Sequence, residues 1–246
     1  LYAGSTGGFV VRTTTGADRR CPIAPGVYIF GLTFDAAGTR LHVATFDTIS
    51  VLDVSADLCG SEVTRWKVRR GLNDLALGPD GAVYASEQDL ASVLRFPRDA
   101  ARDFMGETVT RSSLASALGD PAGLAFGPDG ALYVGGTRGD VMRVVLENGI
   151  EASRSRYAPV AIHANGLAFD ANGDLFVASF SAKRIVRITP SRTVVDIPVD
   201  GASADAFGSI AFGSGALDCR TLYVANARGP MRVVTTAAPG RPLPWQ

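Results

Sequence analysis

Hydrophobic positions along this chain recur in short alternating runs separated by turns rich in Asp, Asn and Gly. Five segments share the pattern of an apolar run, a turn and a second apolar run, and their starts lie 43, 49, 43 and 43 residues apart. They cover residues 30–44, 73–86, 122–135, 165–178 and 208–225. Alternation predicts strands, and turns such as GPDG and DANG predict hairpins because Gly and Asn tolerate positive φ.

A third apolar run follows each segment, and a fourth is visible at residues 193–199. The third runs are residues 50–54, 92–96, 141–145, 184–188 and 231–234. Up to four short antiparallel strands in every repeat of about 40–45 residues are typical of a propeller blade. Helical character is confined to residues 98–118, where the repeat lengthens and we expect an insertion or a single turn.

The N-terminus supplies a partial sixth repeat, because residues 1–4 match the second run and residues 9–13 the third. We therefore expect an all-β, six-bladed β-propeller of four-stranded antiparallel blades, with the first blade incomplete at the N-terminus; five blades is the alternative. It forms one domain over residues 1–246, with blade remnants at 1–29 and blades from about 30, 72, 121, 164 and 207. An upstream strand or the tail at residues 240–246 would close the ring.

Charge and hydropathy exclude several classes of partner. The 24 basic and 24 acidic residues balance, so no nucleic-acid footprint is expected. No apolar run approaches the roughly 20 residues that span a bilayer. Only two of the basic residues are lysine, which indicates a GC-rich bacterial genome. We expect a monomer.

Three cysteines leave the redox compartment open. Cys21, Cys59 and Cys219 are either unpaired thiols, or Cys21 and Cys59 form a disulfide between the outer strands of neighbouring blades. A disulfide would indicate export. We expect a periplasmic or secreted protein, with the cytoplasm as the alternative.

The first residue of each inner strand should lie at one mouth of the central channel. These residues are Phe30, Asn73, Ala122, Asn165 and Gly208, and the next residues are Gly31, Asp74, Gly123, Gly166 and Ser209. Asn73, Asp74 and Asn165 are polar departures from a small or apolar ring. Their oxygens suit a hard cation such as calcium, although the amides could instead cap loops or bind channel water.

Residues 164–190, 72–86 and 207–229 resemble the senescence marker protein/gluconolactonase (regucalcin-like) family, within the wider NHL/strictosidine-synthase-like group of propellers. The resemblance implies six blades and one divalent metal, usually calcium, at the channel mouth. It also implies hydrolysis of sugar lactones or other cyclic esters. The family holds the metal with a Glu, two Asn-type ligands and an Asp.

The match to that ligand set is incomplete. Asn73 and Asp74 match the family's Asn-Asp pair, whereas Asn165 falls where the family has an Asp and Ala122 where it has an Asn. The glutamate would belong to a strand before Leu1. The resemblance therefore implies a degenerate site.

Carboxylates from the loops between second and third strands could supplement the site, with Glu87 as the candidate ligand beside Asn73 and Asn165. A calcium or other divalent ion would polarise a lactone carbonyl and acidify a bound water. Asp74 is the expected general base, and His163 could serve instead. Nucleophile-elbow and phosphate-loop motifs are absent from the sequence.

Two functions follow from these observations. The first is a metal-dependent hydrolase of lactone-type small molecules with a degenerate site. The second is a non-catalytic propeller that binds protein or carbohydrate, which the apolar ring members Phe30, Ala122 and Gly208 favour. The fold does not decide between them.

Overall fold

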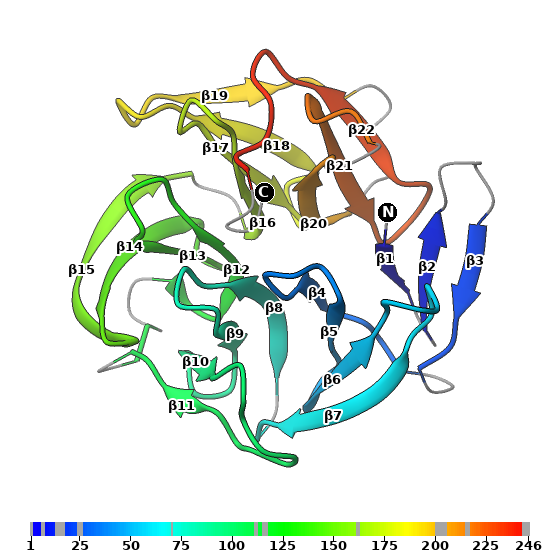
Figure 1. The fold of residues 1–246 in the computed structure, drawn as a ribbon. Helices are drawn as coiled ribbons and strands as arrows, with labels where there is room; N and C mark the ends of the chain where they lie inside the picture. The colour runs from blue at the N-terminus through cyan, green and yellow to red at the C-terminus, as the bar shows by residue number, and fades with distance from the viewer. Residues whose placement is uncertain are drawn as a thin grey trace.

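Small antiparallel sheets surround one axis like the blades of a propeller (Figure 1). The computed structural model describes residues 2–5, 8–12, 18–23, 27–69, 71–110, 113–114, 118–160, 163–199, 206–214 and 217–242. In each sheet the strands pair in chain order, and in the five blades described below the first strand lies nearest the axis.

Four sheets have four strands. They are β4 (Gly31–Phe34), β5 (Arg40–Ala44), β6 (Thr48–Asp53) and β7 (Ser61–Lys67); β8 (Leu72–Leu77), β9 (Val83–Glu87), β10 (Ser92–Phe96) and β11 (Glu107–Thr108); β12 (Pro121–Phe126), β13 (Leu132–Gly136), β14 (Asp140–Glu147) and β15 (Ile150–Pro159); and β16 (Ala164–Phe169), β17 (Leu175–Ser179), β18 (Arg184–Ile188) and β19 (Val194–Ile197). A fifth sheet has three strands, β20 (Phe207–Phe212), β21 (Thr221–Asn226) and β22 (Arg232–Thr235).

The expected six four-stranded blades are corrected to five blades, of which the last has three strands. The inner strands β4, β8, β12, β16 and β20 pack one on the next around the axis. The remaining sheet, β1 (Tyr2–Ser5), β2 (Gly8–Arg12) and β3 (Asp18–Cys21), corresponds to the second to fourth strands of a repeat and has no inner strand among the described residues. Counting repeats by their second and third strands therefore overstated the number of blades.

The C-terminal segment does not close the ring in its described part. Gly240 forms an isolated bridge with Asp170, and the Ala171 N–H donates to the Pro239 carbonyl at 2.8 Å. The segment thus crosses from the last blade to the hairpin of β16 and β17, as the red end of the ribbon shows (Figure 1). Residues 243–246 lie outside the described part.

The hairpins between first and second strands follow the sequence prediction. Gly81 has a φ of 75°, as the tight turn requires. The Asp80 carboxylate accepts hydrogen bonds from the Tyr84 hydroxyl at 3.1 Å and from Arg95 Nε at 2.9 Å. The same arrangement recurs in the next blade around Asp129. Each of these carboxylates thus ties the hairpin to the third strand of its blade.

Apolar side chains fill the interfaces between neighbouring sheets. Trp66 on β7 is fully buried and lies between the rings of His42 and Phe96, with centroids 5.4 and 5.2 Å away. Burial lowers the pKa of His42 to about 4, so this imidazole is neutral and serves the packing. Within residues 98–118 the Leu118 N–H donates to the Leu114 carbonyl at 2.9 Å. Most of the expected turn falls on residues 111–112 and 115–117, which lie outside the described part.

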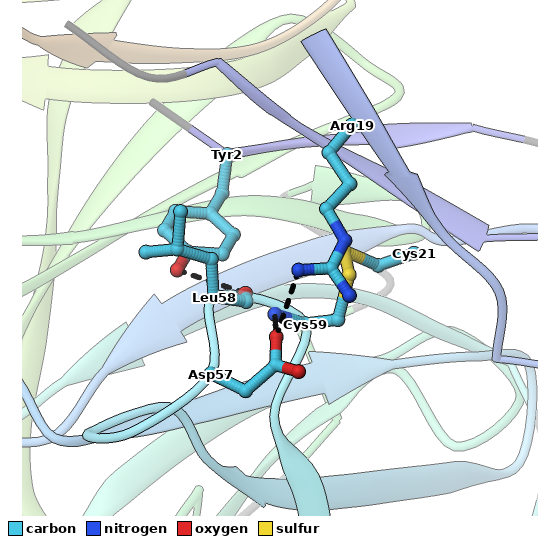
Figure 2. Close-up of a disulfide and its surroundings, with 6 residues drawn as sticks. All are labelled: Tyr2, Arg19, Cys21, Asp57, Leu58 and Cys59. Carbon is cyan, nitrogen blue, oxygen red and sulfur yellow. Dashed lines mark hydrogen bonds and ion pairs between the residues drawn. A yellow bond between two sulfur atoms is a disulfide. The ribbon is translucent and has the colours of Figure 1, made fainter. Parts of the chain in front are cut away.

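A disulfide joins the N-terminal sheet to the blade formed by β4 to β7 (Figure 2). Cys21 at the end of β3 is bonded to Cys59 in the turn between β6 and β7. Arg19 pairs with Asp57 at 3.2 Å beside it, and the Tyr2 hydroxyl donates to the Leu58 carbonyl at 3.0 Å. The pairing alternative left open by the sequence is therefore the one the structure adopts. Cys219 is an exposed free thiol.

No helix in the part of the chain that the structure covers has the length and apolarity to span a bilayer.

Loss of this disulfide is expected to destabilise the protein. The bond closes a segment with a sequence separation of 38 residues, which corresponds to about 4 kcal/mol in the chain-entropy estimate. We expect the Cys21→Ser, Cys59→Ser double variant to unfold at lower urea concentration, and dithiothreitol to reproduce the shift in the wild type. Cys219→Ser is the matched control. An unchanged midpoint in the double variant would contradict a stabilising role of the disulfide.

Candidate functional site

Four of the five inner strands carry an irregularity in the strand register at their start, and β4 pairs with β5 without one. Pairing shifts between Leu72 and Leu75 on β8, and equivalent shifts occur on β12, β16 and β20. Extra residues of this kind redirect side chains away from the regular alternation of a sheet. On β8 and β16 the shift includes the predicted residues Asn73, Asp74 and Asn165, so their orientation follows from it.

Asn73 and Asn165 are half-buried at equivalent places on β8 and β16, with β12 between these strands. Neither amide side chain has a hydrogen-bond partner among the described residues. Asn165 Nδ2 lies 3.9 Å from the position that a Cβ on Gly208 would occupy, so this amide reaches toward the next inner strand. Half-buried amides without protein partners are available to water or a ligand.

Asp74 occupies a different environment from the one the sequence predicted. Its side chain is buried between β8 and β12, with the residue 8% exposed. Oδ1 accepts the Leu75 N–H and Oδ2 accepts the Leu124 N–H, both at 2.9 Å. In the neighbouring interfaces glycine fills this position, and a Cβ on Gly31 or Gly166 would lie within 3 Å of the corresponding backbone nitrogen. Asp74 therefore ties two blades together through the backbone.

Ser86 completes this contact, and the sequence reasoning missed it. The Ser86 hydroxyl accepts the Asp74 N–H at 3.0 Å and donates to the Ala122 carbonyl at 2.6 Å, with the residue fully buried. The equivalent positions in the other four blades hold only Ala or Gly. Asp74 and Ser86 therefore both depart from the repeat at facing positions of one blade, and this shared departure was the sequence signal for a structural pair.

Burial raises the pKa of Asp74 to about 7, and the hydrogen bonds from Leu124 and Leu75 oppose that rise. Both carboxyl oxygens are engaged with the backbone and the side chain does not reach solvent. Asp74 as a general base remains a prediction that this geometry disfavours.

Glu87 ends β9 beside the shifted segment, opposite Leu72 in the sheet. The residue is buried, and its Oε2 accepts the Ser92 hydroxyl at 2.9 Å. Burial raises the pKa of Glu87, while the Ser92 hydrogen bond and the charge of Arg69 lower it. One of its oxygens is thus already satisfied by protein.

His163 directly precedes β16 and is half-buried. Its Nε2 atom is buried and has no hydrogen-bond partner within the described residues. Burial lowers the pKa of this imidazole, and the charge of Asp120 partly restores it. A neutral imidazole with an unpartnered nitrogen can accept a proton.

The oxygen donors at this mouth fall short of what a calcium centre needs. Calcium takes about six to eight oxygens, and its affinity depends on the charge they carry. Asn73, Asn165 and Glu87 offer two neutral amides and one carboxylate that is bonded to Ser92. The described residues include no group of three His, Cys, Asp or Glu side chains that could hold a metal ion. This set does not fit a tightly held calcium ion.

Three aromatic rings lie at the start of the first blade, near this mouth. Tyr28, Phe30 and Phe46 are 63%, 38% and 43% exposed. Ring centroids are 6.5 Å apart for Tyr28 and Phe30 and 6.3 Å for Phe30 and Phe46. Exposed aromatic clusters of this kind mark binding surfaces.

Comparison with known proteins gives a family match over most of the chain. The profile described as "SMP-30/Gluconolactonase/LRE-like region" matches residues 10–228. No protein with curated function matches the sequence significantly.

Solved structures share the fold at low sequence identity. A gluconolactonase of Xanthomonas campestris is 19% identical, with 95% of this chain and 79% of that chain covered and a TM-score of 0.69. A luciferin-regenerating enzyme is 17% identical, with 96% and 86% covered and a TM-score of 0.69. Virginiamycin B lyase of Staphylococcus aureus is 15% identical, with 94% and 74% covered and a TM-score of 0.68. Since these proteins differ in function, the likeness shows the fold alone.

The contact between Asp74 and Leu124 predicts a pH-dependent stability. In the unfolded chain the carboxyl ionises near its ordinary pKa of 3.8, whereas in the folded chain its pKa is about 7. Between those values the unfolded state binds fewer protons, so stability falls as the pH rises. Asp74→Asn lacks this ionisation but places an NH2 group against a backbone N–H, which costs about 1–3 kcal/mol.

We therefore expect Asp74→Asn to be less stable than the wild type at pH 5, with the difference narrowing by pH 8 in urea unfolding. The exposed Asp99→Asn is the control and should show a constant difference. If the stability difference between Asp74→Asn and the wild type is the same at both pH values, the raised pKa of Asp74 is contradicted.

Proposed function

Because this chain belongs to the SMP-30/gluconolactonase/LRE-like family, we propose that it hydrolyses lactone-type cyclic esters at the channel mouth where the inner strands begin. The observation that carries the proposal is the buried Nε2 of His163, which has no hydrogen-bond partner among the described residues, beside Asn165, whose side-chain amide has none there either. The likeness to a gluconolactonase of the same fold supports this reaction class.

In the proposed reaction, neutral His163 takes a proton from a water molecule as the water oxygen attacks the lactone carbonyl carbon. The amide N–H groups of Asn73 and Asn165 donate hydrogen bonds to the oxyanion that forms. The intermediate then breaks the ring C–O bond, and the His163 imidazolium returns the proton to the leaving alkoxide. The product is the open hydroxy acid.

A divalent metal enters this proposal only as a weak ligand. Asn73, Asn165 and Glu87 would hold it, and with one carboxylate among them we expect a Kd of about 1 mM or weaker. The proposed steps above need only the side chains of this chain.

The second candidate is a non-catalytic carbohydrate-binding propeller, which the exposed cluster of Tyr28, Phe30 and Phe46 favours. Aromatic faces stack on the apolar faces of sugar rings. If this function holds, Phe30→Ala and Phe46→Ala abolish glycan binding, and no lactone is hydrolysed by the wild type.

For location we propose a periplasmic or secreted protein, because a disulfide such as Cys21–Cys59 persists in oxidising compartments. We further propose that it acts as a monomer. Fractionation of cells and sedimentation of the purified protein test these two points.

The role of His163 is tested by kinetics on a panel of aliphatic and sugar lactones. We expect His163→Gln to lower kcat/KM by about 100- to 10,000-fold without changing the melting temperature. Because burial lowers the pKa of His163 from 6.5, the wild-type rate should fall on acidification only below pH 6.5. Asn73→Ala should lower kcat by about 10- to 100-fold. Asn172→Ala, on the opposite face, is the matched control.

Full activity of His163→Gln would exclude this imidazole as the base. A rate abolished by chelator, together with a calcium-dependent rise in melting temperature that Asn73→Ala removes, would instead establish a resident metal. If the wild type hydrolyses no lactone, carbohydrate binding remains as the candidate function.

A further inference from the structure

A cavity lies at the other end of the channel from the proposed active site. Its volume is about 680 Å3, within the range of about 300–1,000 Å3 typical of small-molecule sites. It is lined by the ends of β8, β12, β16 and β20 and by their hairpins. The starts of those strands, with Asn73 and Asn165, do not line it.

A repeated small residue keeps this end of the channel open. The fourth position of each inner repeat is Thr33, Ala76, Ala125, Ala168 and Ala211, and all five line the cavity. The following position is aromatic in three successive blades, with Phe126, Phe169 and Phe212. The walls are therefore mainly apolar, and they favour a ligand with an apolar body.

The C-terminal segment forms part of the rim. Gly240 N–H donates to the Cys219 carbonyl at 2.7 Å, and Arg241 N–H donates to the Phe169 carbonyl at 3.0 Å. A Cβ on Gly240 would lie 2.2 Å from Phe212 Cβ, so only glycine allows the segment to approach so closely. The backbone of this segment is thus fixed against the cavity.

Arg241 supplies the charge at this rim. It is the one charged residue among those described that line the cavity. Its Nη1 donates to the Phe126 carbonyl at 3.2 Å, on the inner strand next to the one that holds its backbone, and no carboxylate in the described chain pairs with it. The nearby Asp170 is not a competitor, because its Oδ1 accepts the N–H groups of Asn172 and Asp174 at 2.9 Å.

We propose that this end of the channel binds an apolar monocarboxylate, with its hydrocarbon body between the inner strands and its carboxylate on Arg241. A guanidinium presents several N–H donors in one plane and pairs with carboxylates through two parallel hydrogen bonds. An apolar wall with a single unpaired cation at the rim matches an amphipathic anion. The site is separate from the mouth at which lactone hydrolysis is proposed.

Octanoate is the probe for this site, and 1-octanol has the same chain without the charge. Calorimetry should show one octanoate per chain, with a Kd below about 1 mM. Arg241→Gln should weaken octanoate about 10- to 100-fold and leave octanol unchanged, because it removes the charge-assisted pair. Arg228→Gln, an exposed arginine outside the cavity lining, is the matched control.

Two further measurements locate the ligand. Octanoate should slow the reaction of the Cys219 thiol with a bulky maleimide, because Cys219 lines the same cavity. Ala211→Leu, which adds carbons to the wall, should weaken octanoate and octanol alike while lactone hydrolysis stays unchanged. Asn73→Ala should leave octanoate binding unchanged.

Equal affinity for octanoate and octanol, or an octanoate Kd unaffected by Arg241→Gln, would overturn the role of Arg241. Absence of binding in the wild type, or binding that Ala211→Leu does not weaken, would overturn the site itself. Loss of octanoate binding in Asn73→Ala would place the ligand at the opposite mouth.

Discussion

The approach of neighbouring inner strands is the constraint on which the rest of this structure depends. A Cβ on Gly123 would lie 2.5 Å from the Asn165 carbonyl oxygen, and one on Gly166 would lie 2.5 Å from the Gly208 carbonyl oxygen. Backbone thus meets backbone where the blades converge, and there is no room for a side chain at these positions. This crowding sets the width of the channel and the direction of the residues on either side.

Asp74 is the exception to that rule and shows how it can be relaxed. Its carboxyl group enters the interface between β8 and β12 and accepts the Leu124 N–H. In the neighbouring interfaces glycine holds the equivalent position, and the corresponding backbone nitrogen lies directly against it. Ser86 adds a second link to the same strand. The cost of burying a carboxyl group is offset by two backbone hydrogen bonds, and the adjacent Asn73 is held at the mouth as a result.

Most of the architecture could be predicted from periodicity, because hairpin turns and alternating runs are local features. The bounds of β10 and β18 coincide with the predicted runs at 92–96 and 184–188. The predicted number of blades was wrong. Residues 1–4 and 9–13 resemble the second and third strands of a repeat, but the described residues include no inner strand for it. The family assignment from residues 164–190 is confirmed by the profile match.

The candidate site was less predictable, because a repeat alignment gives the position of a residue along the axis and not its surroundings. Asn73 and Asn165 lie where the alignment placed them, whereas the environment of Asp74 depends on a contact 50 positions away with Leu124. The residues at the far end of the channel had no sequence signal beyond small side chains. The Arg241 contact with the Phe126 carbonyl spans 115 positions and no pattern predicts it.

The disulfide between Cys21 and Cys59 also bears on how the N-terminal sheet stays in place. Among the described residues this sheet has no inner strand, and its apolar side chains pack against those of β4 to β6. The backbone already joins this sheet to β4, so the disulfide adds a second covalent link, and that link keeps the sheet at a high effective concentration beside the blade. A sheet that separates briefly therefore returns to the same blade before it can exchange with the sheet of another molecule.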